Sequence, residues 1–282
     1  MNQEMEGRAP SRPWGSGHDE AWPSKIGIAM LAVVVFAALL APVLAKQGPT
    51  EQAFRDEIFA PPSWAHLLGV DGAGRDVMAR MLYGARVTLG IALGATALAL
   101  FGGALFGMAA ATLRGWFDVA VSHVVDFLLA FPSVLLGLVA LTVLTPSPTS
   151  VAVAVGIANL PAVIRQVRAA FVSEAAKDYV LAAKSAGASW WRIAVVEILP
   201  NCAALILVLT ALTLGSAVLE AAGLAFLGLS GQPDVPEWGM MLREERSAFR
   251  IAPWLCIAPG VAIAWTVLAF NLISDGLQQR RR

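Results

Sequence analysis

Long apolar runs without a charged residue alternate with short polar segments along most of this chain of 282 residues. A helix needs about 20 mostly apolar residues to cross the hydrocarbon core of a bilayer. Runs of that kind occupy residues 26–45, 87–113, 198–219 and 251–274. A further charge-free stretch, residues 127–164, is too long for one crossing and is interrupted by Pro146-Ser147-Pro148. The pattern therefore predicts an all-α membrane protein with six transmembrane helices, the third of which begins near Val119.

The composition supports an integral membrane protein. Hydrophobic residues make up 57% of the chain, charged residues only 14%, and the mean hydropathy is +0.68, whereas soluble domains carry roughly a quarter of charged residues. The net charge is zero, so nothing indicates a nucleic-acid partner. Cys202 and Cys256 open different apolar runs, and we expect two buried thiols at opposite faces of the bilayer rather than a disulfide. The three histidines are scattered without the spacing of metal ligands.

Charge also predicts the orientation. Residues 1–24 are polar, and the apolar run that follows has no clean cleavage site, so we expect a disordered cytoplasmic tail rather than a signal peptide. Six spans place both termini on one side, and the cytoplasmic segments then carry more Lys and Arg than the outer ones. The largest such cluster is Arg280–Arg282. The predicted organisation is a tail (1–24), a first span (25–45), an extracytoplasmic segment (46–86) and a core of five spans (87–282).

The polar segment 173–200, between the fourth and fifth predicted spans, has helix start and stop signals. Ser173 is placed to cap a short helix that runs through Ala186, and Gly187 would end it. Ser189 would cap a second helix leading into the fifth span. Small side chains on the first helix suit docking into a shallow groove of another protein, although an amphipathic linker on the membrane surface fits the periodicity equally well.

This segment contains a motif that narrows those alternatives. The sequence LAAKSAGASWWRIAVVEILP, residues 181–200, resembles the EAA coupling loop of ABC-importer permeases, which has two Ala, a Gly four residues later and a terminal Leu-Pro. Leu181 and Glu197 depart from the family's Glu and Ile. The resemblance implies that an ATPase subunit docks here, with coupling residues Tyr179, Ala182, Ala183, Gly187, Arg192, Leu199 and Pro200.

A second stretch resembles one subfamily of these permeases. Residues 66–89 read HLLGVDGAGRDVMARMLYGARVTL, similar to the signature LGTDxxGRDxxSRxxYGARxSL of the second membrane subunit of dipeptide, oligopeptide and nickel importers. Shorter matches continue to about residue 278, among them GWFD, VDFLLAFPS, FLGL, EWG and AFNLISDGL. The resemblance implies a MetI-like fold of type I ABC importers in the bacterial inner membrane. The implied solute is a short peptide, with nickel or a metal chelate as the alternative.

The same resemblance implies the partners. They are a second homologous permease subunit, two ATP-binding subunits and an extracytoplasmic solute-binding protein. No P-loop (GxxxxGK[ST]) occurs in the sequence, so we expect ATP and Mg to be bound by the ATPase subunits and no cofactor or catalytic residue in this chain. Two hypotheses from other functional classes are a stand-alone ion-coupled carrier and a membrane scaffold without transport. An ion-coupled carrier would require ionisable pairs at mid-membrane.

Charged residues in the outer segments and one intramembrane carboxylate complete the candidate sites. The outer residues would either form a structural ion-pair network or dock the solute-binding protein. Asp126 lies inside a predicted span, where ionisable groups are costly and often functional. It could line the solute path or bond a neighbouring helix. The docking candidates are Arg75, Asp76, Arg80, Arg243 and Arg246.

Overall fold

The computed structural model describes residues 22–45, 47–113, 115–230 and 234–279. The predicted tail up to residue 21 and the terminal arginines lie outside the described residues. Apart from one isolated bridge between Val70 and Asp76, the regular structure in the described part of the chain is helical, which confirms the all-α prediction. The helix α1 begins at Trp22, within the last residues of the predicted tail.

Within the residues that the structure describes, five helices are long and apolar enough to cross a membrane. They are α1 (Trp22–Leu44), α2 (Val77–Leu113), α5 (Pro148–Glu174), α9 (Ala203–Phe226) and α11 (Trp254–Gln279). Each overlaps a predicted apolar run, but α2 begins at Val77 rather than residue 87, α5 continues to Glu174 rather than residue 164, and α9 is shifted toward the C-terminus from the predicted 198–219.

The predicted third span is two helices rather than one. Helices α3 (Gly115–Leu129) and α4 (Ser133–Leu141) meet at an angle of 95°. Pro132 stands at the break and has no backbone N–H to continue the hydrogen bonding of α3. Six crossings result only if this bent pair counts as one span. The next helix, α5, starts at the predicted Pro-Ser-Pro break, where the Ser147 side chain accepts a hydrogen bond from the backbone N–H of Ser150.

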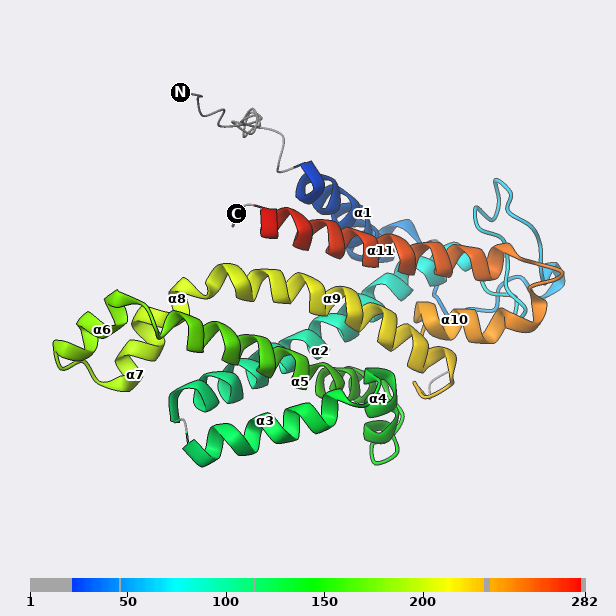
Figure 1. Ribbon diagram of the computed structural model, residues 1–282. Helices are drawn as coiled ribbons and strands as arrows, with labels where there is room; N and C mark the ends of the chain where they lie inside the picture. The colour runs from blue at the N-terminus through cyan, green and yellow to red at the C-terminus, as the bar shows by residue number, and fades with distance from the viewer. Residues whose placement is uncertain (1–21, 46, 114, 231–233, 280–282) are drawn as a thin grey trace, which may run out of the picture.

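Short helices occupy both ends of the bundle (Figure 1). At one end the chain forms α6 (Asp178–Ser185), α7 (Trp190–Arg192), a π-helical turn η2 (Ile193–Ile198) and α8 (Leu199–Asn201). At the other end lie α10 (Trp238–Glu245), two 3-10 turns, η1 (Arg55–Glu57) and η3 (Arg246–Ala248), and the segment that joins α1 to α2. We call these the α6 end and the α10 end.

The predicted cap at Ser173 is wrong. Ser173 lies inside α5, which continues to Glu174 because Val167 and Phe171 remain buried against the bundle. The short helix starts instead at Asp178, with Lys177 at its N-cap.

Close packing of α2 against α5 forms the centre of the bundle. A Cβ added at Gly103 would come within 2.4 Å of a Val163 side-chain carbon, and one at Gly107 within 2.9 Å of the Ile164 carbonyl oxygen. Only glycine allows the two backbones to approach this closely. Helix α9 packs on α2, α5 and α11, and α1 packs on α11. The start of α1 meets the end of α11, since a Cβ at Gly276 would lie 2.5 Å from the Ser24 Cβ.

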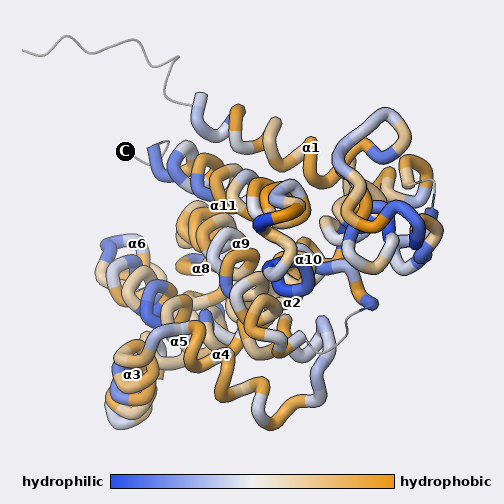
Figure 2. Tube along the Cα trace, turned by 90° about the vertical axis from the view of Figure 1, so that its right-hand side faces the viewer, coloured by the Kyte–Doolittle hydropathy of each residue, from blue (hydrophilic) through white to orange (hydrophobic). Residues whose placement is uncertain are grey.

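Buried apolar residues form two separate cores. The larger core joins α1, α2, α4, α5, α9, α10 and α11 and reaches the α10 end. The smaller core joins α2, α5 and α9 to Val180 of α6 and to Ile193 and Ile198 of the π-helical turn. Figure 2, which views the molecule from the α10 end, shows hydrophilic residues gathered around α10, its neighbouring loops and α6, with mostly hydrophobic helices between them. Cys202 is buried in the smaller core, whereas Cys256 is half-buried near the α10 end.

Candidate functional sites

Helix α6 is fixed to the bundle by one face and exposed on the other. Val180 is completely buried (0% exposed), whereas Leu181 is 52% exposed. Ala182 is also exposed, while Ala183 packs in part against the smaller core. Of the two alanines in the predicted motif, one therefore lies on the surface and the other helps to seat the helix. An exposed Leu beside an Ala leaves a small apolar surface at this end of the molecule.

Gly187 ends α6 by a Schellman motif. Its φ of +78° lies in the left-handed region that non-glycine residues avoid. The N–H of Gly187 donates to the Lys184 carbonyl (3.0 Å), and the N–H of Ala188 donates to the Ala183 carbonyl (3.1 Å). A Cβ at Gly187 would meet no atom within 4 Å. The backbone conformation, rather than lack of space, therefore calls for glycine, and the predicted helix stop is confirmed.

The chain then returns to the bundle through an unusually wide turn. The Ser189 side chain accepts a hydrogen bond from the Arg192 N–H, which confirms the predicted cap of the second helix. The helix widens into the π-helical turn, whose Ile193 and Ile198 are buried. Leu199 packs in part against the smaller core, and Pro200 is exposed. A single π-helical turn often marks a functional position in a helix.

Tyr179 joins three pieces of this segment. Its hydroxyl donates to a Glu174 carboxylate oxygen (2.9 Å) at the end of α5 and accepts from the Asn201 side chain (3.3 Å) in α8. Burial and the hydrogen bond to Glu174 raise the pKa of Tyr179 to about 12. The hydroxyl therefore remains protonated and continues to donate at physiological pH. Tyr179 thus holds α6 between the helices on either side of it.

The charges of the α6 end pair locally. The Lys177 ammonium lies 2.8 Å from the Glu174 carboxylate, three residues away. The Lys184 ammonium lies 4.9 Å from the centre of the Trp190 ring, a distance that allows a cation–π interaction. Arg192 is exposed.

At the α10 end, the charges form a buried network. Arg75 and Arg80 each contact the same two carboxylates, Asp71 (2.6 and 2.9 Å) and Glu244 (2.8 and 2.8 Å). Asp71 and Arg80 are each only 2% exposed. Burial alone would lower the pKa of Arg75, but Asp71 and Glu244 raise it above its ordinary value. This geometry favours the structural interpretation of Arg75 and Arg80, since both guanidinium groups are enclosed between elements.

The other docking candidates differ from these two arginines. Asp76 accepts a hydrogen bond from the Ala79 N–H (2.8 Å), and so caps the start of α2. Arg243 packs over Gly228, where a Cβ would lie 2.3 Å from the guanidinium carbon. Arg246 is exposed. Of the five candidates, Arg246 alone presents its side chain openly at the surface.

Glu237 is a residue that sequence analysis did not single out. It is 2% exposed and caps α10 by accepting from the Met240 N–H (2.8 Å). Its other carboxylate oxygen accepts from the Thr88 hydroxyl (3.3 Å) of α2. Burial raises the pKa of Glu237 above its ordinary value. In the sequence, Glu237 stands directly before the apolar residues that begin α10. It can be recognised as a helix cap only when the start of α10 is known.

Asp126 bonds a neighbouring helix. Its carboxylate lies 3.6 Å from the Arg165 guanidinium of α5, and both side chains are well exposed. Arg168, one helical turn after Arg165 on α5, makes a two-pronged contact with Asp118, about two turns before Asp126 on α3. Two ion pairs thus connect α3 to α5, which favours the bonding role over a place in the solute path.

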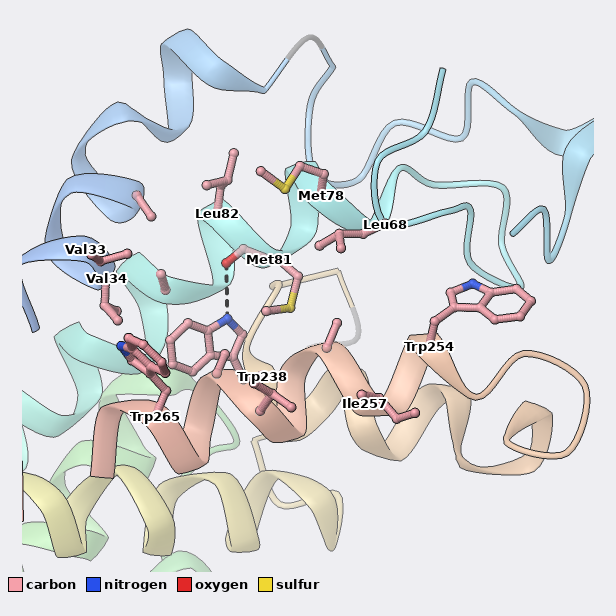
Figure 3. A pocket seen from close by; sticks show the side chains of 15 residues that line it. Val33, Val34, Leu68, Met78, Met81, Leu82, Trp238, Trp254, Ile257 and Trp265 are labelled. Carbon is pink, nitrogen blue, oxygen red and sulfur yellow. Dashed lines mark hydrogen bonds between the residues drawn. The ribbon is translucent and has the colours of Figure 1, made fainter. Parts of the chain in front are cut away.

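Two of the cavities in the described part of the chain differ in character. The larger, about 530 Å³, runs between α1, α2 and α11 and is lined almost wholly by apolar atoms (Figure 3). Within it, the Trp238 indole N–H donates to the Met81 carbonyl (3.1 Å). A second cavity of about 410 Å³ lies between α5, α9 and α11 and is partly polar. Its polar side chains are Asn159, Gln166, Thr213, Ser216 and Asn271.

Comparison with known proteins identifies the family. Residues 103–280 match the family described as the binding-protein-dependent transport system inner membrane component. The chain belongs to this family. It is therefore a membrane-embedded subunit of an ABC importer and not an enzyme, as the coupling motif implied. The several apolar helices agree with a multi-pass protein of the inner membrane.

Curated relatives resemble the chain over most of its length. It is 40% identical over 258 residues to the di/tripeptide transport system permease protein DppC of Pseudomonas aeruginosa, covering 89% of this chain and 85% of that protein. It is 41% identical over 259 residues to the dipeptide transport system permease protein DppC of Escherichia coli, covering 90% and 86%. The protein of the same name from Alkalihalophilus pseudofirmus is 37% identical over 269 residues, covering 94% and 88%.

Proposed function

We propose that this chain is a permease subunit of an ATP-driven importer of dipeptides and short oligopeptides. The observation that carries the peptide assignment is the similarity to dipeptide permeases, which extends over about nine-tenths of the chain. By this proposal the chain forms half of the solute path and a second, homologous permease subunit forms the other half. A solute-binding protein delivers the peptide, and two partner ATPases hold ATP and Mg.

The α6 end is the place where an ATPase would dock. The exposed surface around Leu181 and Ala182 offers an apolar contact in place of the family's Glu. Because the opposite face of α6 shares a core with Phe171 of α5 and Leu209 of α9, a displacement of α6 would be transmitted to those two helices. Both helices line the polar cavity. The segment would thus act as a lever between the ATPase and the solute path.

The proposed orientation follows from the same assignment. If ATPases dock at the α6 end, that end faces the cytoplasm. The start of α1 and the end of α11 pack together and lie away from α10 (Figure 1), so both termini would be cytoplasmic. The α10 end, with the exposed Arg246, would then face the solute-binding protein. This agrees with the excess of Lys and Arg predicted on the cytoplasmic side.

The experiment that tests the proposal is ATPase activity of the reconstituted complex with its solute-binding protein. The panel contains di-, tri- and oligopeptides, free nickel and nickel chelates. We expect stimulation by the peptides alone. Stimulation only by nickel or a chelate would overturn the peptide assignment but keep the importer. A chain that binds no ATPase, yet exchanges solute by itself, would overturn the coupling proposal and support an ion-coupled carrier.

A further inference from the structure

A carboxylate inside the helix bundle accepts hydrogen bonds from neutral groups on two neighbouring helices. Glu220 lies in α9, and its two oxygens accept hydrogen bonds from the Ser133 hydroxyl (2.7 Å) of α4 and the Asn159 amide (2.7 Å) of α5. The Ser216 hydroxyl, one turn earlier in α9, donates to the Asn159 amide oxygen (3.1 Å). The four side chains form one continuous hydrogen-bonded chain across α4, α5 and α9.

Glu220 has no cation of its own. Within the described residues, no Lys, Arg or His nitrogen lies within 4 Å of its carboxylate, whereas Asp118 and Asp126 each have an arginine of α5. A carboxylate removed from water and left without a counter-ion is costly, and an ionisable group inside a membrane span by default marks a functional position. Two neutral groups, the Ser133 hydroxyl and the Asn159 amide, donate to this carboxylate, and neither brings a positive charge to it.

The network adjoins the polar cavity. Asn159 and Ser216 line that cavity, and Glu220 stands directly behind Asn159. Because the Asn159 N–H₂ group is engaged by Glu220, its carbonyl oxygen is directed to Ser216, on the side of the cavity. The Ser216 oxygen and the second lone pair of the Asn159 oxygen remain able to accept hydrogen bonds in this wall, and the Glu220 carboxyl group lies behind them. The larger cavity of Figure 3 offers almost no polar atom and suits no charged solute.

We propose that Glu220, Asn159 and Ser216 form a site in the wall of the polar cavity that takes a primary ammonium group. In a peptide importer this group is the α-amino group of the transported peptide, so the identity of the ligand rests on the function proposed above. An ammonium group matches the site because it brings one positive charge and three donors to acceptors. A bare divalent metal ion would call for several ligands, and the described residues contain no group of three His, Cys, Asp or Glu that could hold one.

The first test measures the potential in the cavity without any peptide. A single cysteine is placed at Thr213 after Cys202 and Cys256 are replaced by Ala, and its reaction rates with a cationic and an anionic methanethiosulfonate are compared in the assembled complex. We expect the cationic reagent to be favoured, and Glu220→Gln to reduce that preference about tenfold. Asp126→Asn is the matched control and should leave the preference unchanged, because Arg165 already balances that charge. An equal preference with and without Glu220→Gln would overturn the proposal.

The second test uses transport and separates this site from the function as a whole. In proteoliposomes with saturating binding protein, we expect Glu220→Gln to lower the amount of dialanine imported per ATP hydrolysed about tenfold, with Glu220→Asp and Asp126→Asn near wild type. Equal import per ATP by Glu220→Gln, or equal loss in Glu220→Gln and Glu220→Asp, would reduce Glu220 to a structural role. If the wild-type complex imports no dialanine, the peptide assignment fails, while the reagent preference still decides whether the cavity selects cations.

Discussion

The two ends of the bundle pair their charged residues differently. At the α10 end, Arg80 and Glu244 are 164 residues apart in sequence, yet they form a buried contact of 2.8 Å. At the α6 end, Lys177 and Glu174 are three residues apart, and the lysine side chain is 56% exposed whereas that of Glu174 is 12% exposed. The first arrangement holds distant segments in one rigid cap. The second leaves the Lys177 ammonium at the surface, where it can contact a partner.

Burial explains the difference in energetic terms. Two guanidinium groups shared between two carboxylates compensate one another, but removing one of them leaves buried charge without a counter-ion, at a cost of about 3–5 kcal/mol. An exposed pair contributes about 0–1 kcal/mol. The comparison therefore predicts that substitutions at the α10 end change the stability of the fold, and that substitutions at the α6 end change the association with a partner.

The largest expected effect is that of Arg80→Met. It leaves Asp71 and Glu244 facing Arg75 alone in a buried site, so we expect a loss of about 3–5 kcal/mol in the free energy of unfolding. Thermal unfolding of the purified subunit in detergent measures it. Arg250→Met, an exposed position at the same end, is the control and should unfold like the wild type. Equal melting of the two variants would contradict the structural role of the network.

Gly187→Val tests the opposite end. A β-branched residue at a φ of +78° is strained by about 1–3 kcal/mol, and we expect the end of α6 to be displaced while the bundle stays folded. The measurement is co-purification of the ATPase subunits at wild-type yield of the permease. Gly187→Asn tolerates the left-handed conformation better and should retain more of the association. Normal ATPase recovery and uptake with Gly187→Val would refute the need for this turn.

A smaller effect is expected for Glu237→Gln, and it depends on pH. Because burial raises the pKa of Glu237, the folded state binds this proton more tightly than the unfolded state does. Glu237 therefore adds stability as pH falls from neutral toward its ordinary pKa near 4.5, and this contribution is lost as pH rises. Gln keeps one acceptor for the cap, so we expect a change of about 1 kcal/mol at neutral pH. Thermal unfolding is measured from pH 5 to 8, and the melting temperature of Glu237→Gln should depend less on pH than that of the wild type. An equal pH dependence of the two melting temperatures would be inconsistent with this account.

The smallest effect is that of Lys177→Ala. The pair with Glu174 is exposed on the lysine side, so its removal should cost less than about 1 kcal/mol. Thermal unfolding at low and at high salt is the measurement. A loss comparable to that of Arg80→Met would erase the distinction between the two ends.

Local signals in the sequence predicted much of the fold. The apolar runs located the spans, the Pro-Ser-Pro break separated α4 from α5, and Gly187 and Ser189 were identified correctly as helix stop and cap. These features depend on neighbouring residues, as capping and breaking do. Pro132 lies inside an apolar run, so the run alone did not reveal the sharp bend between α3 and α4.

Features that depend on distant residues were not predictable in the same way. Ser173 has the chemistry of a cap, but burial of Phe171 carries α5 past it. The charge-free run 198–219 places Glu220 just beyond the fifth predicted span, whereas α9 continues to Phe226. The pairing of Arg75 and Arg80 with Glu244 joins segments that no local pattern relates. Each of these outcomes is decided by tertiary packing.

The contact between α2 and α5 limits how this bundle can change shape. Gly103 and Gly107 pack closely against Val163 and Ile164. A sliding movement of one helix along the other would therefore produce a steric clash. We therefore expect α2 and α5 to move as one rigid pair throughout a transport cycle. The surrounding helices would then move relative to this pair when one side of the membrane opens and the other closes. We expect the largest movements in α9 and at the bend between α3 and α4.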